Sequence, residues 1–268
     1  MKALNQNSLL ALLLIIIVAN ACSRYEVLDN TSSLPPLPLI ATKNNVTQLP
    51  LGSDPRYGYY DKYINAYIDD YKTGIPIIST DEVEDEALKN VKATVQEILS
   101  SNTELNKAIV KQGGMFVILD ENESVADNIA LVERAGSTSG LIETGICYQY
   151  SDNYKGKEES VGSIGQLIFR AGLYSYDSLV YNSVFNVADS AESSGIYHPE
   201  NTWDQEQKTE RYFTIGVEVW FGIWKGYPSA DNGRYDVVSR TLMETKDTNL
   251  YNILKKIFIE KDWNPCNQ

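Results

Sequence analysis

Histidine is the scarcest reactive side chain in this sequence, because His198 is the only one among 268 residues. A Ser–His–Asp or Cys–His site needs an imidazole that takes the proton of the nucleophile near neutral pH. Catalytic zinc is usually held by two or three histidines, or by histidine with cysteine or glutamate. His198 precedes a proline in a turn-like context, which is typical of an exposed loop residue. The sequence therefore predicts neither kind of centre and no cofactor.

Carboxylates are abundant, with 36 Asp and Glu against 23 Lys and Arg and a formal net charge of −13. Two well-placed carboxylates can hydrolyse a glycosidic bond, and carboxylates alone can hold calcium. The sequence has no Asp-x-Asp-x-Asp-Gly loop, and its spacing singles out no catalytic pair. Gly113-Gly114 lacks the Lys-Ser/Thr ending of a phosphate-binding loop. Such an acidic chain repels phosphate backbones, so we expect no nucleic-acid partner.

The first of the three cysteines, Cys22, follows a segment typical of an export signal. Lys2 supplies a positive charge, residues 9–18 are apolar, and Ala19-Asn20-Ala21 places small residues before Cys22. The apolar run is shorter than the roughly 20 residues that span a bilayer. The segment is similar to a lipobox, although a lipobox usually has Leu where Ala19 stands. We therefore expect residues 1–21 to be removed and Cys22 to be lipidated in the bacterial cell envelope, with the outer membrane favoured; plain secretion is the alternative.

Cys147 and Cys266 remain in the mature chain, whose net charge becomes −14 when Lys2 is removed. In an exported protein two thiols can pair, and a bond across so long a loop stabilises by about 4 kcal/mol in the chain-entropy model. The alternative is two separate buried thiols. Export favours the disulfide.

The elements that must position any site are mostly helical. Residues 22–56 are predicted to be a lipidated N-terminus and tether, because five prolines stand there among Ser, Thr and Asn. Residues 57–268 fit a single globular domain. Apolar spacing predicts helices behind a Ser79-x-x-Glu82 capping box and over residues 103–111, 160–174, 177–190, 206–221 and 247–261. Residues 115–119 predict a buried strand, and the fold class is α+β, mostly helical.

Several short stretches resemble the secreted zincin-type metallopeptidase domains, whose zinc-binding helix carries a His-Glu-x-x-His motif. The resemblance covers about residues 58–266 and lies in residues 59–64, 74–79, 83–88, 152–156, 212–221 and 239–251. Each stretch is short, and their order and spacing carry the resemblance. It implies a zincin-like metallopeptidase scaffold.

The same resemblance implies that the metal site is not intact. Gln166 and Arg170 stand where the motif has its two histidines, and Leu167 stands where it has the glutamate that activates water. Arg211 takes the place of the third ligand. A guanidinium group carries a positive charge and only donates hydrogen bonds, so it repels zinc. We expect Arg170 and Arg211 to fill the site by reaching carboxylates, and Leu167 and Ile215 to close it with apolar bulk.

Together these observations predict a cell-envelope lipoprotein whose catalytically inactive domain acts as a binding or interaction module for an unidentified protein or glycan. Trp203 and Trp224 lie in predicted loops, where an indole can stack on a sugar or anchor a protein. Alternatively, both rings pack against the core. The alternative function is a hydrolase of another class that uses a carboxylate pair, for example on glycans.

Overall fold

The computed structural model describes residues 45–49, 60–69, 73–120, 122, 138–142, 146 and 159–263. All the described residues belong to one compact unit. The predicted signal segment, most of the predicted tether, Cys22, Cys147 and Cys266 lie outside the described residues. Within the described ranges, no helix combines the length and apolar character that crossing a bilayer requires.

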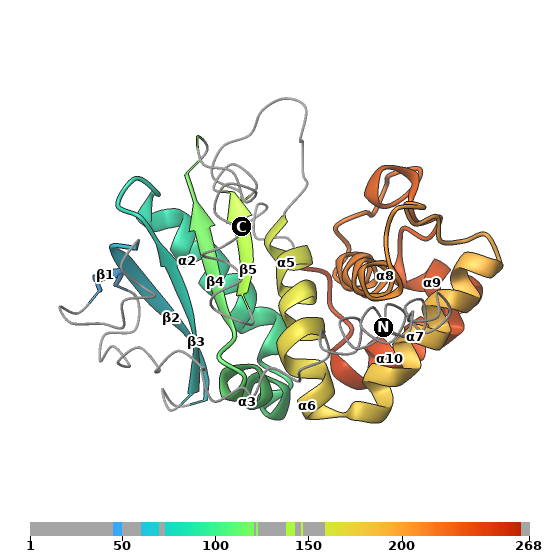
Figure 1. The fold of residues 1–268 in the computed structure, drawn as a ribbon, viewed down its shortest axis with the longest axis horizontal. Helices are drawn as coiled ribbons and strands as arrows, with labels where there is room; N and C mark the ends of the chain where they lie inside the picture. The colour runs from blue at the N-terminus through green and yellow to red at the C-terminus, as the bar shows by residue number, and fades with distance from the viewer. Residues whose placement is uncertain are drawn as a thin grey trace, which may run out of the picture. The chain divides into compact units, whose positions relative to one another are not determined.

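Five strands form one mixed sheet in the order β1-β2-β3-β4-β5 (Figure 1). The strands are β1 (Thr47–Gln48), β2 (Lys62–Asp69), β3 (Thr73–Ser79), β4 (Met115–Leu119) and β5 (Thr138–Ile142). Neighbours pair antiparallel from β1 to β3 and parallel from β3 to β5. The prediction of strand β4 is confirmed, whereas β2, β3 and β5 were not predicted, and β1 lies inside the predicted tether.

Side chains alternate between the two faces of this sheet, and most of the described ones in β2, β3 and β4 are buried on both. Ile64 pairs with Ile77 and Ala66 with Ile75, and these residues belong to the main core. Tyr63, Ile78 and Val117 belong to a second, smaller apolar cluster. A strand buried on both faces has an unbroken apolar sequence, which is why β4 could be recognised from the sequence.

The helix α2 (Asp85–Leu99) begins later than its sequence pattern indicates. The predicted capping box at Ser79 is wrong, because Ser79 is the last residue of β3 and pairs with Lys62 and Ile118 in the sheet. The residue that precedes α2 is Glu84, whose side chain makes no capping bond. The next helix, α3 (Thr103–Lys111), follows its prediction, and Asn102 Oδ1 caps it by accepting from Leu105 N at 3.0 Å.

A continuous helical segment comprises α5 (Glu159–Leu167), the π-helical turn η6 (Ile168–Leu173) and α6 (Tyr174–Tyr176). It contacts β5 and α2 on one side and α8 (Gln205–Trp220) on the other (Figure 1). π-Helical turns are rare and often occur near functional sites. The predicted helix at residues 160–174 is confirmed by this segment, whereas the π-helical turn within it was not predicted.

The remaining helical elements of the described chain precede and follow α8 in the sequence. They are α7 (Ser178–Ser193), the 3₁₀ turn η7 (Asp231–Gly233), α9 (Arg240–Lys246) and α10 (Thr248–Ile257). α7 and α10 contact each other and α8. α9 was not predicted, and α10 ends before the predicted residue 261, because Phe258 adopts an extended conformation and packs on Phe221 with ring centroids 5.3 Å apart. The fold class is α+β with helix predominating, as predicted.

Candidate functional site

Two glycines let α5 approach α8 closely. A Cβ atom added at Gly162 would lie 2.2 Å from Glu218 Oε1, and one at Gly165 would lie 3.3 Å from Thr214 Cα. Gly162 and Gly165 are three residues apart, so they lie on the same face of α5. Any larger side chain there would push the two helices apart or displace Glu218.

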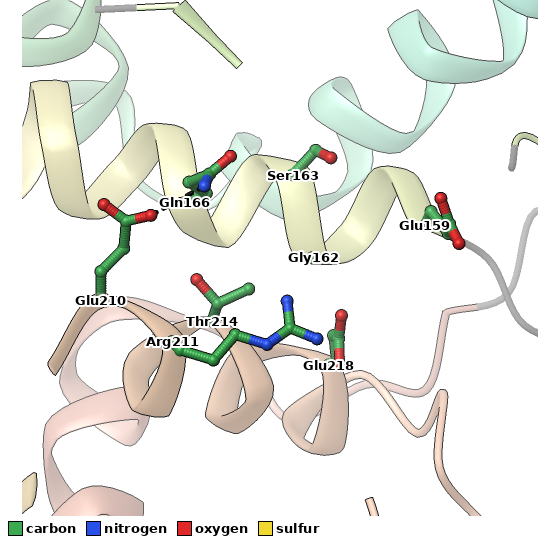
Figure 2. A pocket seen from close by; sticks show the side chains of 8 residues that line it. All are labelled: Glu159, Gly162, Ser163, Gln166, Glu210, Arg211, Thr214 and Glu218. Carbon is green, nitrogen blue, oxygen red and sulfur yellow. Dashed lines mark hydrogen bonds between the residues drawn. The ribbon is translucent and has the colours of Figure 1, made fainter. Parts of the chain in front are cut away.

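A pocket of about 200 Å³ lies between the two helices (Figure 2). Its lining is polar and comes from α5 and α8 alone: Glu159, Gly162, Ser163, Gln166, Glu210, Arg211, Thr214 and Glu218. The volume is below the range of about 300–1,000 Å³ that holds drug-sized ligands. The pocket can therefore take a small polar group.

Glu210 joins the two helices at one end of the pocket. Its carboxylate accepts from Gln166 Nε2 at 2.7 Å and from Arg170 Nε and Nη2 at 2.7 and 2.8 Å. Two parallel bonds between a guanidinium and a carboxylate are among the stronger polar contacts in proteins. Since Gln166 and Arg170 come from α5 and η6 and Glu210 from α8, this cluster fixes the spacing of the helices.

Arg211 is held by a carboxylate from outside the two helices. Asp231 accepts from Arg211 Nε at 2.8 Å and from Nη2 at 2.5 Å, and its side chain is only 2% exposed. Burial disfavours the charged form of Arg211, yet the hydrogen bond to Asp231 and the charges of Glu218 and Asp231 raise its pKa above the ordinary value. Arg211 therefore keeps its positive charge beside the pocket.

Glu218 lies in the pocket lining and is 4% exposed. Its Oε2 accepts from the indole Nε1 of Trp224 at 2.7 Å. Trp224 itself is buried, so it supports the carboxylate from behind and offers no exposed ring face to a ligand. For Trp224 the structure matches the alternative in which the ring packs against the core.

Thr214 carries the least satisfied polar atom of the pocket. Its side chain points from α8 into the space below α5 (Figure 2), and the residue is 4% exposed. Thr214 Oγ1 has no hydrogen-bond partner in the described part of the chain. A buried hydroxyl without a partner costs about 1–3 kcal/mol, which a bound ligand could recover. Glu159, at the other end of the lining, forms no ion pair with another described residue.

The structure brings together most of the positions that the zincin resemblance singles out. Gln166 and Arg211 line the same pocket, and Arg170 binds Glu210 at its edge. Both arginines reach carboxylates, as expected. The expected closure by Leu167 and Ile215 is not observed: neither lines the pocket, and both are buried in the main core.

The other two candidate residues lie away from this pocket. Trp203 is half-buried, and the guanidinium of Arg234 lies over its ring at 5.3 Å from the centroid. His198 has a side chain that is 49% exposed, and its Nε2 lies 3.5 Å from Asp236 Oδ2. Among the described residues, no group of three or more His, Cys, Asp or Glu side chains is arranged to hold a metal ion.

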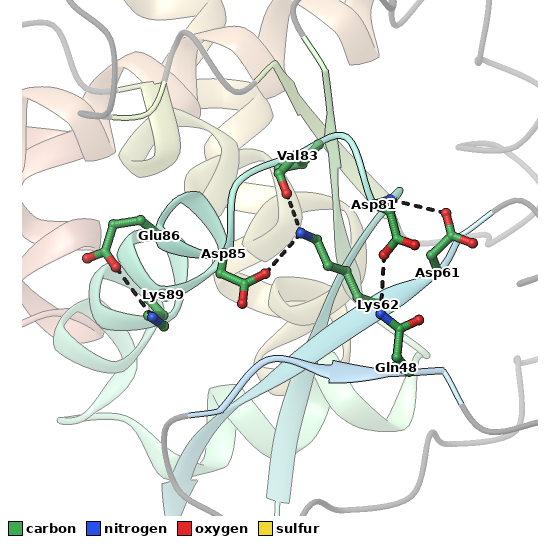
Figure 3. Close-up of polar contacts among 8 residues, drawn as sticks. All are labelled: Gln48, Asp61, Lys62, Asp81, Val83, Asp85, Glu86 and Lys89. Atoms are coloured by element: carbon green, nitrogen blue, oxygen red, sulfur yellow. Dashed lines mark hydrogen bonds and ion pairs between the residues drawn. The ribbon is translucent and has the colours of Figure 1, made fainter.

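A second polar cluster fastens the start of α2 to the sheet (Figure 3). Lys62 Nζ donates to Val83 O and to Asp85 Oδ1, the latter at 2.9 Å. Asp61 accepts from the backbone N–H of Asp81 at 3.1 Å. Because these groups satisfy one another between β2 and the start of α2, the cluster has a structural role.

Sequence reasoning did not identify Glu210, Thr214, Glu218 and Asp231 as site residues. Glu210 is 40 residues from Arg170, and Asp231 is 20 residues from Arg211, so no local pattern links the partners. One signal was available: Gly162 and Gly165 lie on one helical face, a spacing that permits close packing of a second helix.

Comparison of the chain with protein families, with curated proteins and with solved structures gives no match.

Proposed function

We propose that the chain is an exported, lipid-anchored protein of the bacterial cell envelope whose domain is a zincin-like scaffold that binds a ligand and performs no zinc-dependent hydrolysis. One observation is the main support for the loss of zinc binding. Arg170 and Arg211, at positions that the resemblance matches to metal ligands, are each held by a carboxylate, Glu210 and Asp231.

The side chains at these two positions cannot ligate a metal ion. Zinc in proteins is bound by neutral imidazole, thiolate or carboxylate groups. A guanidinium group stays protonated and has no lone pair to donate to a metal. The raised pKa of Arg211 strengthens this argument, because its neighbours stabilise the charged form.

The pocket supports a binding role. It lies between α5 and α8, its lining consists of polar residues and one glycine, and Thr214 Oγ1 has no hydrogen-bond partner among the described residues. Ligand sites combine a concave surface with a few convergent polar groups. Ser163, Gln166 and Thr214 supply such groups here.

Metal analysis of the purified full chain tests the loss of zinc. We expect less than stoichiometric zinc after incubation with zinc salt and dialysis, and no peptidase activity that a chelator abolishes. Glu210→Ala serves as a companion variant, because it releases Gln166 and Arg170 and still supplies no histidine. Stoichiometric zinc in the wild type, with chelator-sensitive peptide hydrolysis, overturns the proposal.

The hydrolase with a carboxylate pair is a second candidate, since Glu159, Glu210 and Glu218 line one pocket. Glu210 forms an ion pair with Arg170. We therefore test Glu159, at the start of α5, and Glu218, on α8, as the pair. A screen of chromogenic glycosides measures turnover by the wild type, by Glu159→Gln and by Glu218→Gln. Turnover that both substitutions abolish would favour this second candidate; no turnover by the wild type would exclude it for these substrates.

A further inference from the structure

A row of side chains runs along one face of the continuous segment α5–η6–α6. Gln166, Arg170 and Tyr174 follow one another at intervals of four residues. A four-residue repeat drifts in one direction around an α-helix and in the other around a π turn, which holds more residues per turn, so η6 keeps the row on one face. Gln166 and Arg170 both donate to Glu210 of α8. Tyr174 contacts Tyr181 of α7, so the whole row faces α7 and α8.

The row ends at a tyrosine ring that is exposed to solvent. Tyr174 is 63% exposed, and its ring meets the ring of Tyr181 at 84°, with the centroids 5.5 Å apart. Tyr181 lies 5.1 Å from the ring of Phe169, which belongs to the main core. An edge-to-face contact covers at most one face of a ring. Tyr174 is therefore anchored to the core by ring contacts, while a ring face stays available to a ligand.

Hydrogen-bonding groups lie between this ring and the pocket. Figure 2 shows Gln166 of α5 opposite Glu210 of α8 at one end of the pocket. Arg170, one turn further toward Tyr174, binds the same carboxylate through Nε and Nη2, and its side chain is 42% exposed. Arg170 Nη1 makes no hydrogen bond with another described residue. We call Gln166, Glu210, Arg170 and Tyr174 the α5–α6 strip, which combines donors, an acceptor and an exposed ring.

Carboxylates make the α5–α6 strip unsuitable for an anionic ligand. Glu206 and Glu210 are four residues apart on α8, and of these two only Glu210 forms an ion pair with a described residue. Burial raises the pKa of Tyr181, and the charges of Glu206 and Glu210 raise it further, because they disfavour another negative charge beside them. A phosphate or carboxylate group bound next to Tyr181 would meet the same repulsion.

From this arrangement we infer that the α5–α6 strip binds a neutral oligosaccharide. A sugar ring has an apolar C–H face, which can stack on Tyr174, and a rim of hydroxyl groups, which both donate and accept hydrogen bonds. Arg170 supplies donors and Glu210 supplies an acceptor one turn away. A membrane or an apolar protein surface would need a contiguous apolar patch, whereas this strip has one ring among charged groups. The inference deepens the proposed function and rests on it, since it names the ligand class of the binding domain.

Isothermal titration calorimetry of the purified full chain tests this inference with neutral probes: cellohexaose, xylohexaose, maltohexaose and N-acetylchitohexaose. We expect at least one of them to bind at one site per chain. Tyr174→Ala should weaken that binding about tenfold, because it removes the ring on which the sugar stacks. Tyr174→Phe keeps the ring, so it should weaken binding by no more than about threefold.

Two further variants test the polar part of the strip and its boundary. Arg170→Ala should weaken binding about tenfold, because it removes the exposed donors. Leu179→Ala is the matched control: this apolar residue of α7 is 80% exposed but lies outside the row, so its loss should leave the affinity unchanged. Thermal unfolding of each variant separates a lost contact from a lost fold. Should Arg170→Ala fail to fold, Tyr174→Ala still decides the inference.

Hexagalacturonate, a negatively charged hexasaccharide, should bind about tenfold more weakly than the neutral probe that binds. Equal binding of hexagalacturonate overturns the inference. So does the absence of a site for every neutral probe, or unchanged affinity in Tyr174→Ala or in folded Arg170→Ala. Equal weakening by Leu179→Ala and Tyr174→Ala also overturns it, and would assign this surface to an apolar partner.

Zinc content measured on the same preparation keeps the two proposals distinguishable. A zinc-free protein that binds none of the neutral probes overturns the ligand assignment alone. Stoichiometric zinc with chelator-sensitive peptidase activity overturns the proposed function, whatever the calorimetry shows.

Discussion

Two arginines and the carboxylates that neutralise them give the candidate site its chemical character. Arg170 is 42% exposed and its partner Glu210 16%, whereas Arg211 is 33% exposed and its partner Asp231 only 2%. Exposed ion pairs contribute little because water and salt screen them, and buried charges that lose a partner are costly. The two pairs should therefore differ in their contribution to stability.

We expect Asp231→Asn to lower the free energy of unfolding by about 2–3 kcal/mol, since it leaves the largely buried Arg211 charge without its carboxylate. Asn suits the left-handed backbone of this position, where φ is +47°, so the change tests the charge alone. Glu210→Gln should cost about 1 kcal/mol. Chemical denaturation measures both, with Glu104→Gln on the exposed face of α3 as the control; equal costs at positions 231 and 210 would contradict the argument.

A buried group of tyrosines makes the stability of the domain depend on pH. Tyr212 and Tyr235 both donate to Asp247 Oδ2, Tyr235 at 2.8 Å. Burial is the largest cause that raises the pKa of each tyrosine, and the charge of Asp247 raises it further. An unfolded tyrosine ionises near pH 10.

Because the pKa is higher in the folded state, the stabilisation from these tyrosines is complete below about pH 10 and is lost as the pH rises from there toward the folded value. Denaturation at about pH 8 and about pH 11 should show this loss. Tyr212→Phe should cost about 1–3 kcal/mol at the lower pH and weaken the pH dependence, because Asp247 loses one donor. Tyr174→Phe, at a side chain that is 63% exposed, should change neither quantity.

At the scale of the elements, the site depends on how closely α5 and α8 approach. Gly162 and Gly165 remove side-chain bulk from the contact, and the bonds from Gln166 and Arg170 to Glu210 hold it. The π turn η6 follows directly after α5 and contains Arg170. The pocket therefore lies between two helices that approach closely at Gly162 and Gly165. Hydrogen bonds from Gln166 and Arg170 to Glu210 join the same helices at one end of the pocket.

Gly162→Ala tests this contact. Alanine favours the helix by about 1 kcal/mol over glycine, but its Cβ would lie 2.2 Å from Glu218 Oε1 and would displace a carboxylate that Trp224 holds. A displaced buried carboxylate loses a charged hydrogen bond, so we expect a net loss of about 1 kcal/mol and a changed tryptophan fluorescence. Ser163→Ala, one residue along, adds no bulk and should leave both unchanged. A stabilised Gly162→Ala protein with unaltered fluorescence would contradict the tight contact.

At the scale of the whole molecule, the N-terminal segment predicts the cellular location. Removal of residues 1–21 leaves a net charge of −14 and Cys22 as the first residue. One acyl chain gives only reversible membrane binding, so a stable anchor requires more than one. The proposed envelope protein therefore needs Cys22 to carry several chains.

Cys22→Ser tests this anchor in a bacterial host. We expect the wild-type chain in the membrane fraction, with an N-terminal peptide whose mass includes several acyl chains, and the variant in the soluble fraction. Cys147→Ser should stay with the membrane, because that residue lies outside the predicted lipobox. Wild-type protein that is cleaved after Ala21 but carries no lipid would instead support plain secretion.

The helical part of the fold was largely predictable. Periodic apolar residues marked α3, the α5–η6–α6 segment, α7 and α8, because a helix that packs on a core must repeat its apolar face. The sheet was mostly missed. Pro76 lies within β3, and β2 alternates polar and apolar residues less regularly, so neither strand has a clear period of two.

The sequence by itself determined that one imidazole is available and that arginine stands at two positions where the resemblance places metal ligands. It also determined the α+β class, since apolar periodicity is a local property of the chain. Only the tertiary structure decided the partners of those arginines, the pocket, and the burial of the Thr214 hydroxyl without a hydrogen-bond partner among the described residues. These features arise from contacts between helices distant in sequence, and such contacts depend on packing that no local pattern encodes.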